Sequence, residues 1–299
     1  MDKPRIGYVG LGVMGGALAR RLLREHALTV FDLSPERRAE FAALGATVVD
    51  SPAAVGAASD IVLTCLPTSA QVKEVIFGDN HGLIRGLRAG GLIADQTSGA
   101  TAATRAMAAE LAGSGIDLID APVSGGPARA KTGTLTLMVG ASDADLTTAR
   151  PVLEAMGTPN HVGPVGMGET VKLVNQIMIS SIMLANCEGL VFAAKAGANV
   201  EAVREVILTA TGSNYLLQNW LPQTWLSGNF DGGFALDLLR KDVAAALDAA
   251  RTMGVPMPST ALAYQLFTAA SSEGHGRHDY SSVSTFYERA AGTHIAKPA

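Results

Sequence analysis

The sequence is poor in cysteine and in charge, and both shortages narrow the classes of protein to which it can belong. Cys65 and Cys187 are the two cysteines in 299 residues, and both lie inside apolar runs. We therefore expect buried free thiols rather than a disulfide framework. Charged residues make up 17% of the chain, and the formal net charge is -4. This balance leaves no basic surface of the kind that binds nucleic acid or an anionic membrane, so neither is an expected partner.

The sequence also lacks an uninterrupted apolar run of membrane-spanning length. Its most apolar stretch, residues 177–194, contains Ser180, Ser181, Asn186 and Glu188, which predicts a buried helix rather than a membrane span. A strand pattern begins within the first ten residues and leaves no room for a signal peptide, so we expect a cytoplasmic protein. With 48% hydrophobic residues, the chain is long enough to fold as two globular domains.

What the chain does have is a glycine-rich turn near its start. Residues 6–9 predict a short buried strand, and an apolar helical pattern continues through Leu22. Between them stands Gly10-Leu11-Gly12-Val13-Met14-Gly15, which has the G-x-G-x-x-G spacing of a dinucleotide-binding turn. The glycines of such a turn allow a tight bend and a close approach of the pyrophosphate, and the helix N-terminus faces the phosphates. We therefore predict that these six residues bind a dinucleotide.

Asp32 bears on which dinucleotide binds. It ends a second predicted strand, residues 28–31, and lies twenty residues after Gly12. A carboxylate at this spacing accepts hydrogen bonds from the adenosine ribose and disfavours a 2′-phosphate, so NAD is the predicted preference. Arg37 and Arg38 keep NADP open, because a nearby arginine can accept that phosphate. Capping of the next helix is the alternative role for Asp32, although Ser34 is also available for it.

Strand and helix patterns alternate through the first half of the chain and then give way to helices alone. The later predicted strands are residues 47–49, 60–65, 91–95, 116–120 and 134–139. The helical patterns of the second half are residues 170–196, 200–210, 236–253, 258–271 and 282–290. The predicted fold class is α/β: a Rossmann-type, doubly wound, mostly parallel sheet at residues 1–163, followed by an all-helical domain at residues 164–299. The helix at residues 170–196 is apolar on most sides, so we expect it to lie between domains or between subunits.

Lys172 stands near the start of this apolar helix, with Asn175 and Gln176 on neighbouring parts of one face. A lysine in such a place either reaches solvent along its aliphatic stem or is held in a polar pocket. In the second case desolvation lowers its pKa toward neutrality, which suits proton exchange with a hydroxyl or carbonyl group at the domain junction. The residues alone leave both interpretations open.

Two further segments follow predicted strands at the edge where doubly wound sheets bind ligands. Leu66 and Pro67 come after residues 60–65, and Ser124-Gly125-Gly126 comes after residues 116–120. The second segment is either a plain turn or a small anion site, in which backbone N–H groups and the Ser124 hydroxyl hold a carboxylate.

Three other patterns have plainer interpretations. The glycine cluster at residues 163–168 is expected to bring a helix end close to a ligand. Lys241 and Asp242 are typical of a solvated helix face. His275, His278 and Asp279 are typical of a surface turn and do not complete a ligand set, so no metal is expected.

Taken together, these segments resemble the β-hydroxyacid dehydrogenase family over essentially the whole chain. Four ordered motifs carry the resemblance: Gly10-Leu-Gly-Val-Met-Gly15, Asp120-Ala-Pro-Val-Ser-Gly-Gly126, Gly166-Met-Gly-Glu-Thr-Val-Lys172-Leu-Val-Asn175 and Leu239-Arg-Lys241-Asp242. The resemblance implies an oxidoreductase that moves a hydride between NAD(H) and a short 3-hydroxy acid or its semialdehyde, of the 3-hydroxyisobutyrate or tartronate semialdehyde type. It also implies a homodimer or a homotetramer.

The resemblance further implies roles for individual residues. Lys172 is implied as the catalytic acid/base, with Ser124, Gly125, Gly126, Asn175 and Phe234 binding the substrate. Ser98 and Lys241 are implied beside the cofactor, and Asp242 lines or supports the site. Many members place the asparagine four residues after the lysine, a position that is Gln176 here, so either Asn175 or Gln176 faces the substrate.

Two rival functions fit the same fold. Imine reductases are built similarly but usually lack the lysine, so Lys172 favours hydroxy acids. A non-catalytic nucleotide-binding scaffold is the third hypothesis, and the intact candidate catalytic positions argue against it.

Overall fold

The computed structural model describes residues 3–295 and divides into two compact units. The division follows Lys172 and falls inside helix α8 (Met167–Lys195). The boundary predicted between residues 163 and 164 lies just ahead of this helix, at the end of strand β9 (Gly157–Gly163).

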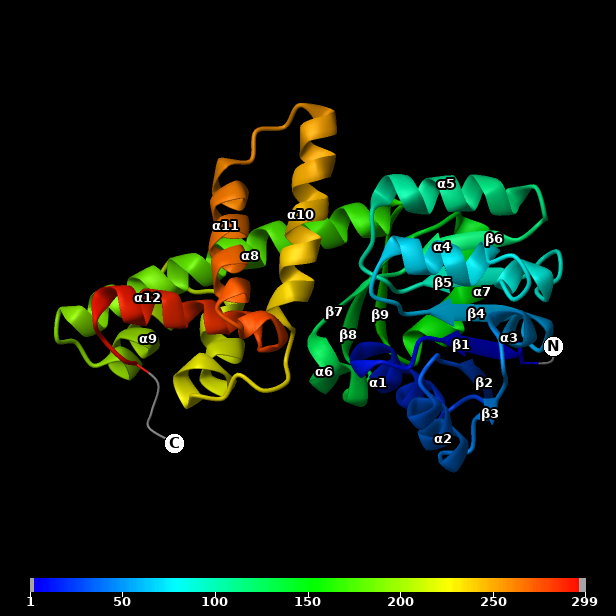
Figure 1. Ribbon diagram of the computed structural model, residues 1–299, viewed down its shortest axis with the longest axis horizontal. Helices are drawn as coiled ribbons and strands as arrows, with labels where there is room; N and C mark the ends of the chain where they lie inside the picture. The colour runs from blue at the N-terminus through cyan, green and yellow to red at the C-terminus, as the bar shows by residue number, and fades with distance from the viewer. Residues whose placement is uncertain (1–2, 296–299) are drawn as a thin grey trace. The chain divides into compact units, whose positions relative to one another are not determined.

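The first unit is built on one sheet with the strand order β3-β2-β1-β4-β5-β6-β8-β7, in which β9 also pairs with β8 (Figure 1). The strands are β1 (Ile6–Val9), β2 (Leu28–Phe31), β3 (Thr47–Val48), β4 (Ile61–Thr64), β5 (Leu92–Asp95), β6 (Asp117–Asp120), β7 (Val123–Ser124), β8 (Leu135–Gly140) and β9. The helices are α1 (Val13–Leu22), α2 (Pro35–Ala43), α3 (Pro52–Ala57), α4 (Ser69–Phe77), α5 (Thr101–Ala112), α6 (Gly126–Thr132) and α7 (Asp143–Glu154). Strands β1 to β6 are parallel, and β8 runs antiparallel to β6. The predicted doubly wound, mostly parallel sheet is confirmed.

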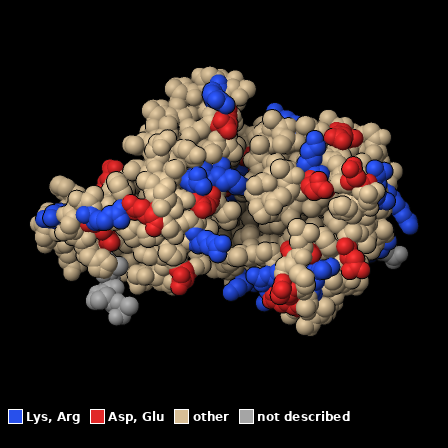
Figure 2. Space-filling model, viewed as in Figure 1, with Lys and Arg blue, Asp and Glu red and all other residues tan. Residues whose placement is uncertain are grey.

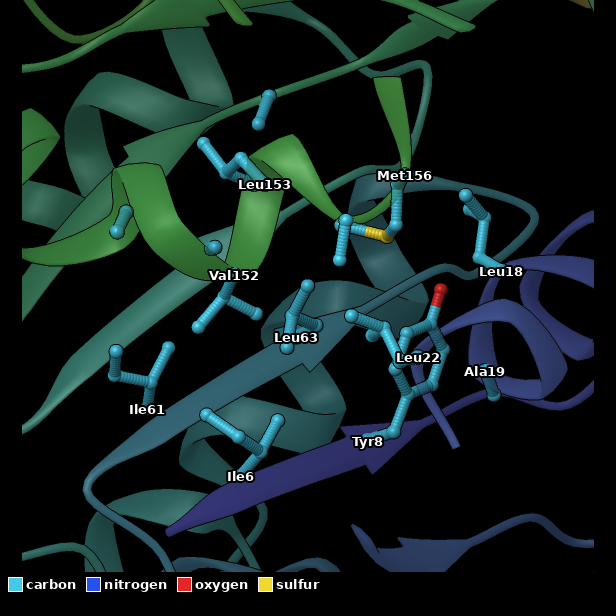
Figure 3. Close-up of a cluster of buried hydrophobic side chains, with 14 of the residues drawn as sticks. Ile6, Tyr8, Leu18, Ala19, Leu22, Ile61, Leu63, Val152, Leu153 and Met156 are labelled. Atoms are coloured by element: carbon cyan, nitrogen blue, oxygen red, sulfur yellow. The ribbon is translucent and has the colours of Figure 1, made fainter. Parts of the chain in front are cut away.

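Side chains of the central strands alternate between two cores, one on each face of the sheet. Ile6 and Tyr8 of β1 join α1 and α7 in one core, whose packing Figure 3 shows, whereas Val9 faces the core formed by α3, α4 and α5. Ile61 and Leu63 of β4 repeat the alternation. A strand buried on both faces needs apolar residues at every position. This explains why these segments are continuous apolar runs and do not alternate between apolar and polar residues.

Four described elements of the first unit were not predicted, namely β7, α6, β9 and the short helical turn Leu83–Arg85. β7 has two residues and α6 has seven, too few for a recognisable period. β9 has the sequence GTPNHVG and pairs with β8 alone. An edge strand tolerates Pro159, which has no backbone N–H, because no second neighbouring strand needs a donor at that position. β9 therefore precedes the glycine cluster at residues 163–168, where no strand was predicted.

The second unit contains helices alone over the described residues from 173 to 295, apart from one isolated β-bridge. Besides α8 they are α9 (Val200–Leu208), α10 (Leu236–Met253), α11 (Pro258–Ser272) and α12 (Ser284–Ala291), with short helical turns at Leu216–Trp220, Leu221–Gln223, Trp225–Ser227, His275–Arg277 and Tyr280–Val283. Its core surrounds the fully buried Trp225. The predicted all-helical second half is confirmed.

Helix α8 is long and apolar enough to cross a membrane by length and composition alone. Ser180, Asn186 and Cys187 are nevertheless buried along it, as expected for a packed helix of a globular protein. Neither Cys65 nor Cys187 forms a disulfide, as predicted. Cys187 is buried, which raises the pKa of its thiol, whereas Cys65 is half-buried, so the prediction of buried thiols is confirmed for Cys187 alone. Lysine and arginine as well as aspartate and glutamate are scattered among uncharged residues on the face shown in Figure 2.

Candidate functional site

The predicted cofactor segments lie at one edge of the first unit's sheet. Strands β1, β4, β5 and β6 are neighbours and parallel, so the turns that follow them meet at their carboxyl ends (Figure 1). The turns after β1, β4 and β5 carry Gly10, Leu66 with Pro67, and Ser98, and Ser124 ends the short strand β7 that follows β6. The chain order reverses between β1 and β4, and such a switch point is where open α/β sheets bind ligands.

The three glycines of the first turn are required for different reasons. Gly10 has φ +96°, and a Cβ there would overlap the carbonyl oxygen of Cys65. A Cβ at Gly15 would overlap the carbonyl oxygen of Gly10, so the packing of α1 against β1 itself demands glycine. Gly12 precedes α1 with φ -63°, and a Cβ there would meet nothing within 4 Å. The protein leaves this space open, which fits a phosphate-binding turn in front of the exposed Val13 and the half-buried Met14.

Asp32 ties the end of β2 to this turn. Its Oδ2 accepts a hydrogen bond from the Leu11 N–H at 2.6 Å, and its Oδ1 accepts one from the Ser34 N–H at 2.8 Å. Ser34 caps α2 by accepting from the Arg37 N–H, so the alternative role proposed for Asp32 belongs to Ser34. Each carboxylate oxygen of Asp32 keeps a second lone pair for a ribose hydroxyl.

The first turn of α8 is anchored by a buried carboxylate that the sequence analysis did not single out. Asp120, at the end of β6, accepts from the Gly166 and Glu169 N–H groups at 2.7 Å each. Glu169 in turn accepts from the Gly99 N–H at 2.9 Å. Burial raises the pKa of Asp120, and hydrogen bonds from backbone N–H groups oppose this effect. The start of α8 is thereby fixed against the ends of β5 and β6.

Lys172 lies on α8 one turn after Glu169, and its side chain is buried against the protein rather than solvated. It is 7% exposed, and its Nζ donates a hydrogen bond to the Val123 carbonyl oxygen at 3.0 Å. The lysine therefore lies beside Ser124, at the end of β7. Gly125 and Gly126 follow with φ +131° and +70°, a left-handed backbone that favours glycine. Arg129 packs over this turn, its Cδ 2.8 Å from the place of a Cβ on Gly125.

In the second unit, four polar side chains predicted near the site form one connected group. Asn175 donates to Gln176 at 2.9 Å, Gln176 donates to Asp242 at 2.7 Å, and Asp242 forms an ion pair with Lys241 at 3.0 Å. Asp242 is 2% exposed. The interpretation of Lys241 and Asp242 as a solvated helix face is therefore wrong for Asp242, because this carboxylate is buried and bonded to Gln176 of α8, 66 residues away in sequence.

Phe234 is positioned by another buried aspartate. Asp279 accepts from the Phe234 N–H at 2.9 Å and from the Trp220 indole N–H at 3.0 Å, and burial raises its pKa. The predicted surface turn is wrong for Asp279, which is fully buried. His275 and His278 do lie together, with 3.1 Å between their Nδ1 atoms, yet residues 3–295 contain no cluster of three or more side chains suited to a metal ion.

Asp95, at the end of β5, makes the free energy of unfolding depend on pH. Burial raises its pKa to about 6, although Thr64 and Thr97 donate hydrogen bonds to it. Because the folded-state pKa lies above the unfolded value, ionising Asp95 costs stability as the pH rises from about 4 to 6. We expect Asp95→Asn to remove this cost, so that the variant gains about 3 kcal/mol on the wild type between pH 4 and pH 7. Urea unfolding of both proteins at each pH measures the gain, and a pH-independent difference would contradict it.

Two family models match the chain. One, described as the NAD binding domain of 6-phosphogluconate dehydrogenase, matches residues 5–172, and one described as NAD-binding of NADP-dependent 3-hydroxyisobutyrate dehydrogenase matches residues 166–287. The chain is 40% identical to 2-(hydroxymethyl)glutarate dehydrogenase of Eubacterium barkeri, over 98% of this chain and 97% of that protein. It is 34% identical to 2-hydroxy-3-oxopropionate reductase of Escherichia coli, over 93% and 95%. Among solved structures, 3-hydroxyisobutyrate dehydrogenase of Mycobacterium tuberculosis, solved with L-serine, matches with a TM-score of 0.87 and 30% identity, over 95% of this chain and 99% of that one.

Proposed function

The chain belongs to the β-hydroxyacid dehydrogenase family and is a nicotinamide-dependent oxidoreductase of hydroxy acids, and on this premise we propose that Lys172 is its general acid/base and NAD its preferred cofactor. The proposed substrate is a short 3-hydroxy acid or the corresponding semialdehyde. The three relatives described above support this class, because the compounds in their names each place a hydroxyl or aldehyde carbon two bonds from a carboxylate.

The observation that carries the proposal is the position of Lys172. Its Nζ atom lies 3.0 Å from the Val123 carbonyl oxygen, one residue from Ser124, and it acts as a base in its neutral amine form and as an acid in its ammonium form. A bound nicotinamide supplies the hydride chemistry. In the oxidation direction Lys172 takes the proton from the substrate hydroxyl, and in the reduction direction it returns a proton to the carbonyl oxygen.

The Ser124 turn is the proposed anchor for the substrate carboxylate. The Ser124 hydroxyl and the N–H groups of Gly125 and Gly126 are the donors, and Arg129 adds a positive charge beside the turn. Holding the carboxylate there fixes the reacting carbon within reach of the lysine. Asn175 and Phe234 are the further proposed substrate contacts.

The cofactor contacts are proposed from the turns at the sheet edge. The open space at Gly12 fits a phosphate, and the proposed contacts are Gly10, Leu11, Gly12, Val13, Met14, Gly15, Asp32, Leu66, Pro67, Ser98 and Lys241. Asp32 supports NAD over NADP because a carboxylate after the second strand accepts hydrogen bonds from ribose hydroxyls and repels a 2′-phosphate.

A panel of substrates tests this function. We expect turnover of 3-hydroxyisobutyrate, 2-(hydroxymethyl)glutarate or 2-hydroxy-3-oxopropionate, with a higher kcat/KM for NAD(H) than for NADP(H). Reduction of a cyclic imine without turnover of any hydroxy acid would overturn the substrate class. A higher kcat/KM with NADP(H) would overturn the role of Asp32 alone.

Self-association as a homodimer or homotetramer is also proposed. Val174, Met178 and Phe192 are exposed on one face of α8, and apolar patches of this kind mark interfaces. Met178 and Phe192 each lie seven residues from Ala185, so two antiparallel copies of α8 centred on Ala185 pair each methionine with a phenylalanine. Sedimentation should give two or four chains, and a monomer would contradict it.

The cytoplasm is the proposed location. Neither Cys65 nor Cys187 forms a disulfide, which suits a reducing compartment.

A further inference from the structure

Asn175 and Gln176 are adjacent amides on α8, and the structure gives them different surroundings. Gln176 is 1% exposed and uses both ends of its amide, since Oε1 accepts from Asn175 and Nε2 donates to Asp242. Asn175 is half-buried, and its Oδ1 accepts no hydrogen bond within residues 3–295. Gln176 is therefore committed to the protein, whereas Asn175 keeps an acceptor for a ligand.

Asp242 determines the direction of the hydrogen bonds that join it to Gln176 and Asn175. Asp242 is paired with the Lys241 ammonium at 3.0 Å and can only accept hydrogen bonds, so Gln176 has to present its NH₂ group to it. The Gln176 oxygen then faces Asn175, which has to present its own NH₂ group in return. The carboxylate thus fixes the orientation of two successive amides, and the second is left with its oxygen available.

We propose that Gln176 is a positioning residue, which transmits the orientation set by Asp242 to Asn175 and so holds the Asn175 oxygen ready for a hydrogen-bond donor of the substrate. The proposal rests on the function above, because it takes Asn175 as a substrate contact. Gln176 itself touches no substrate. A shorter asparagine at position 176 would lack the methylene needed to reach both Asn175 and Asp242, which accounts for glutamine at this position.

A charge swap tests the hydrogen-bond polarity directly. Gln176→Glu alone places two carboxylates where a donor and an acceptor now lie 2.7 Å apart, and we expect kcat/KM for the hydroxy acid to fall about 30-fold. In the double variant Gln176→Glu with Asp242→Asn, the asparagine donates to the new carboxylate, which still accepts from Asn175. Recovery of kcat/KM to within about threefold of the wild type is expected. A double variant no better than Gln176→Glu would overturn the proposal.

A second cycle tests whether Gln176 acts through Asn175. Gln176→Met is expected to lower kcat/KM about tenfold in the wild-type background and to have no further effect in an Asn175→Ala background. Equal losses in both backgrounds would mean a general packing role and would overturn the proposal. Gln265→Met, at an exposed position of α11, is the matched control and should leave kcat/KM unchanged.

Binding measurements separate this inference from the proposed function. In the non-reactive complex with NADH, calorimetry should show that wild type binds 3-hydroxyisobutyrate more tightly than isobutyrate, and that Gln176→Met loses most of this difference. The Kd of NADH should stay within twofold, because the pair of Asp242 and Lys241 remains intact. Failure of wild type to turn over any hydroxy acid overturns the proposed function, whereas an active wild type whose preference survives Gln176→Met overturns this inference alone.

Discussion

Replacing Lys172 by alanine is expected to lower kcat by about 10²- to 10⁴-fold, in both directions of the reaction. The substitution removes the group proposed to move the substrate proton and leaves the sheet edge intact. The first turn of α8 stays anchored because Asp120 accepts from backbone N–H groups, which the substitution does not alter. We therefore expect the Kd of NADH, measured by fluorescence titration, to change less than threefold.

Two further variants separate proton transfer from simple loss of charge. Lys172→Arg keeps a positive charge but cannot release a proton near neutral pH, so its kcat should fall almost as far as that of Lys172→Ala. Lys195→Ala removes an exposed lysine at the other end of the same helix and should leave kcat unchanged. An arginine variant that keeps more than half of the wild-type kcat would show that charge alone matters, and the acid/base role would be wrong.

Helices and strands whose apolar pattern extends over many residues were predictable from the sequence, and short or irregular ones were not. The bounds of α10 were predicted residue for residue, because seventeen steps of a helical period leave little ambiguity and Gly254 ends it. β9 was missed because it is an edge strand whose Gly157, Pro159 and Asn160 are rare in strands. Its only signal is position, directly after α7.

The candidate site residues were easier to single out from the sequence than the residues that support them. The glycine turn, Lys172 and the Ser124 turn are local motifs in which spacing carries the information. Asp120 holds the start of the helix that carries Lys172, and Asp279 holds Phe234, through partners 46 and 45 residues away in sequence, and no local pattern reports such pairs. A signal was nevertheless present, since an aspartate at the end of an apolar strand is costly to bury unless several donors surround it.

A side chain at Gly12 is expected to weaken cofactor binding without destabilising the fold, and this substitution has the second of the two largest expected effects. We expect Gly12→Ala to weaken NADH binding about 100-fold, because the added methyl group occupies the space into which a phosphate would fit. Overlap of this kind typically costs 1–3 kcal/mol, and the upper value corresponds to about two decades in Kd. Stability without the cofactor should be nearly unchanged, because φ -63° suits alanine and a Cβ meets nothing within 4 Å.

Gly15→Ala should show the reverse order of effects. Its Cβ would overlap the Gly10 carbonyl oxygen, so the variant should unfold at a lower urea concentration even without NADH. Gly113→Ala, at the end of α5, supplies the matched control. Gly113 is exposed with φ -62°, and a Cβ there makes only an ordinary contact with the Glu110 carbonyl oxygen at 3.5 Å, so neither stability nor affinity should fall. Urea unfolding of the three variants measures the effect on stability, and NADH fluorescence titration measures the effect on cofactor affinity. If Gly12→Ala bound NADH as tightly as the wild type, the dinucleotide would not approach this turn, and the assignment of the sheet edge as the cofactor site would be wrong.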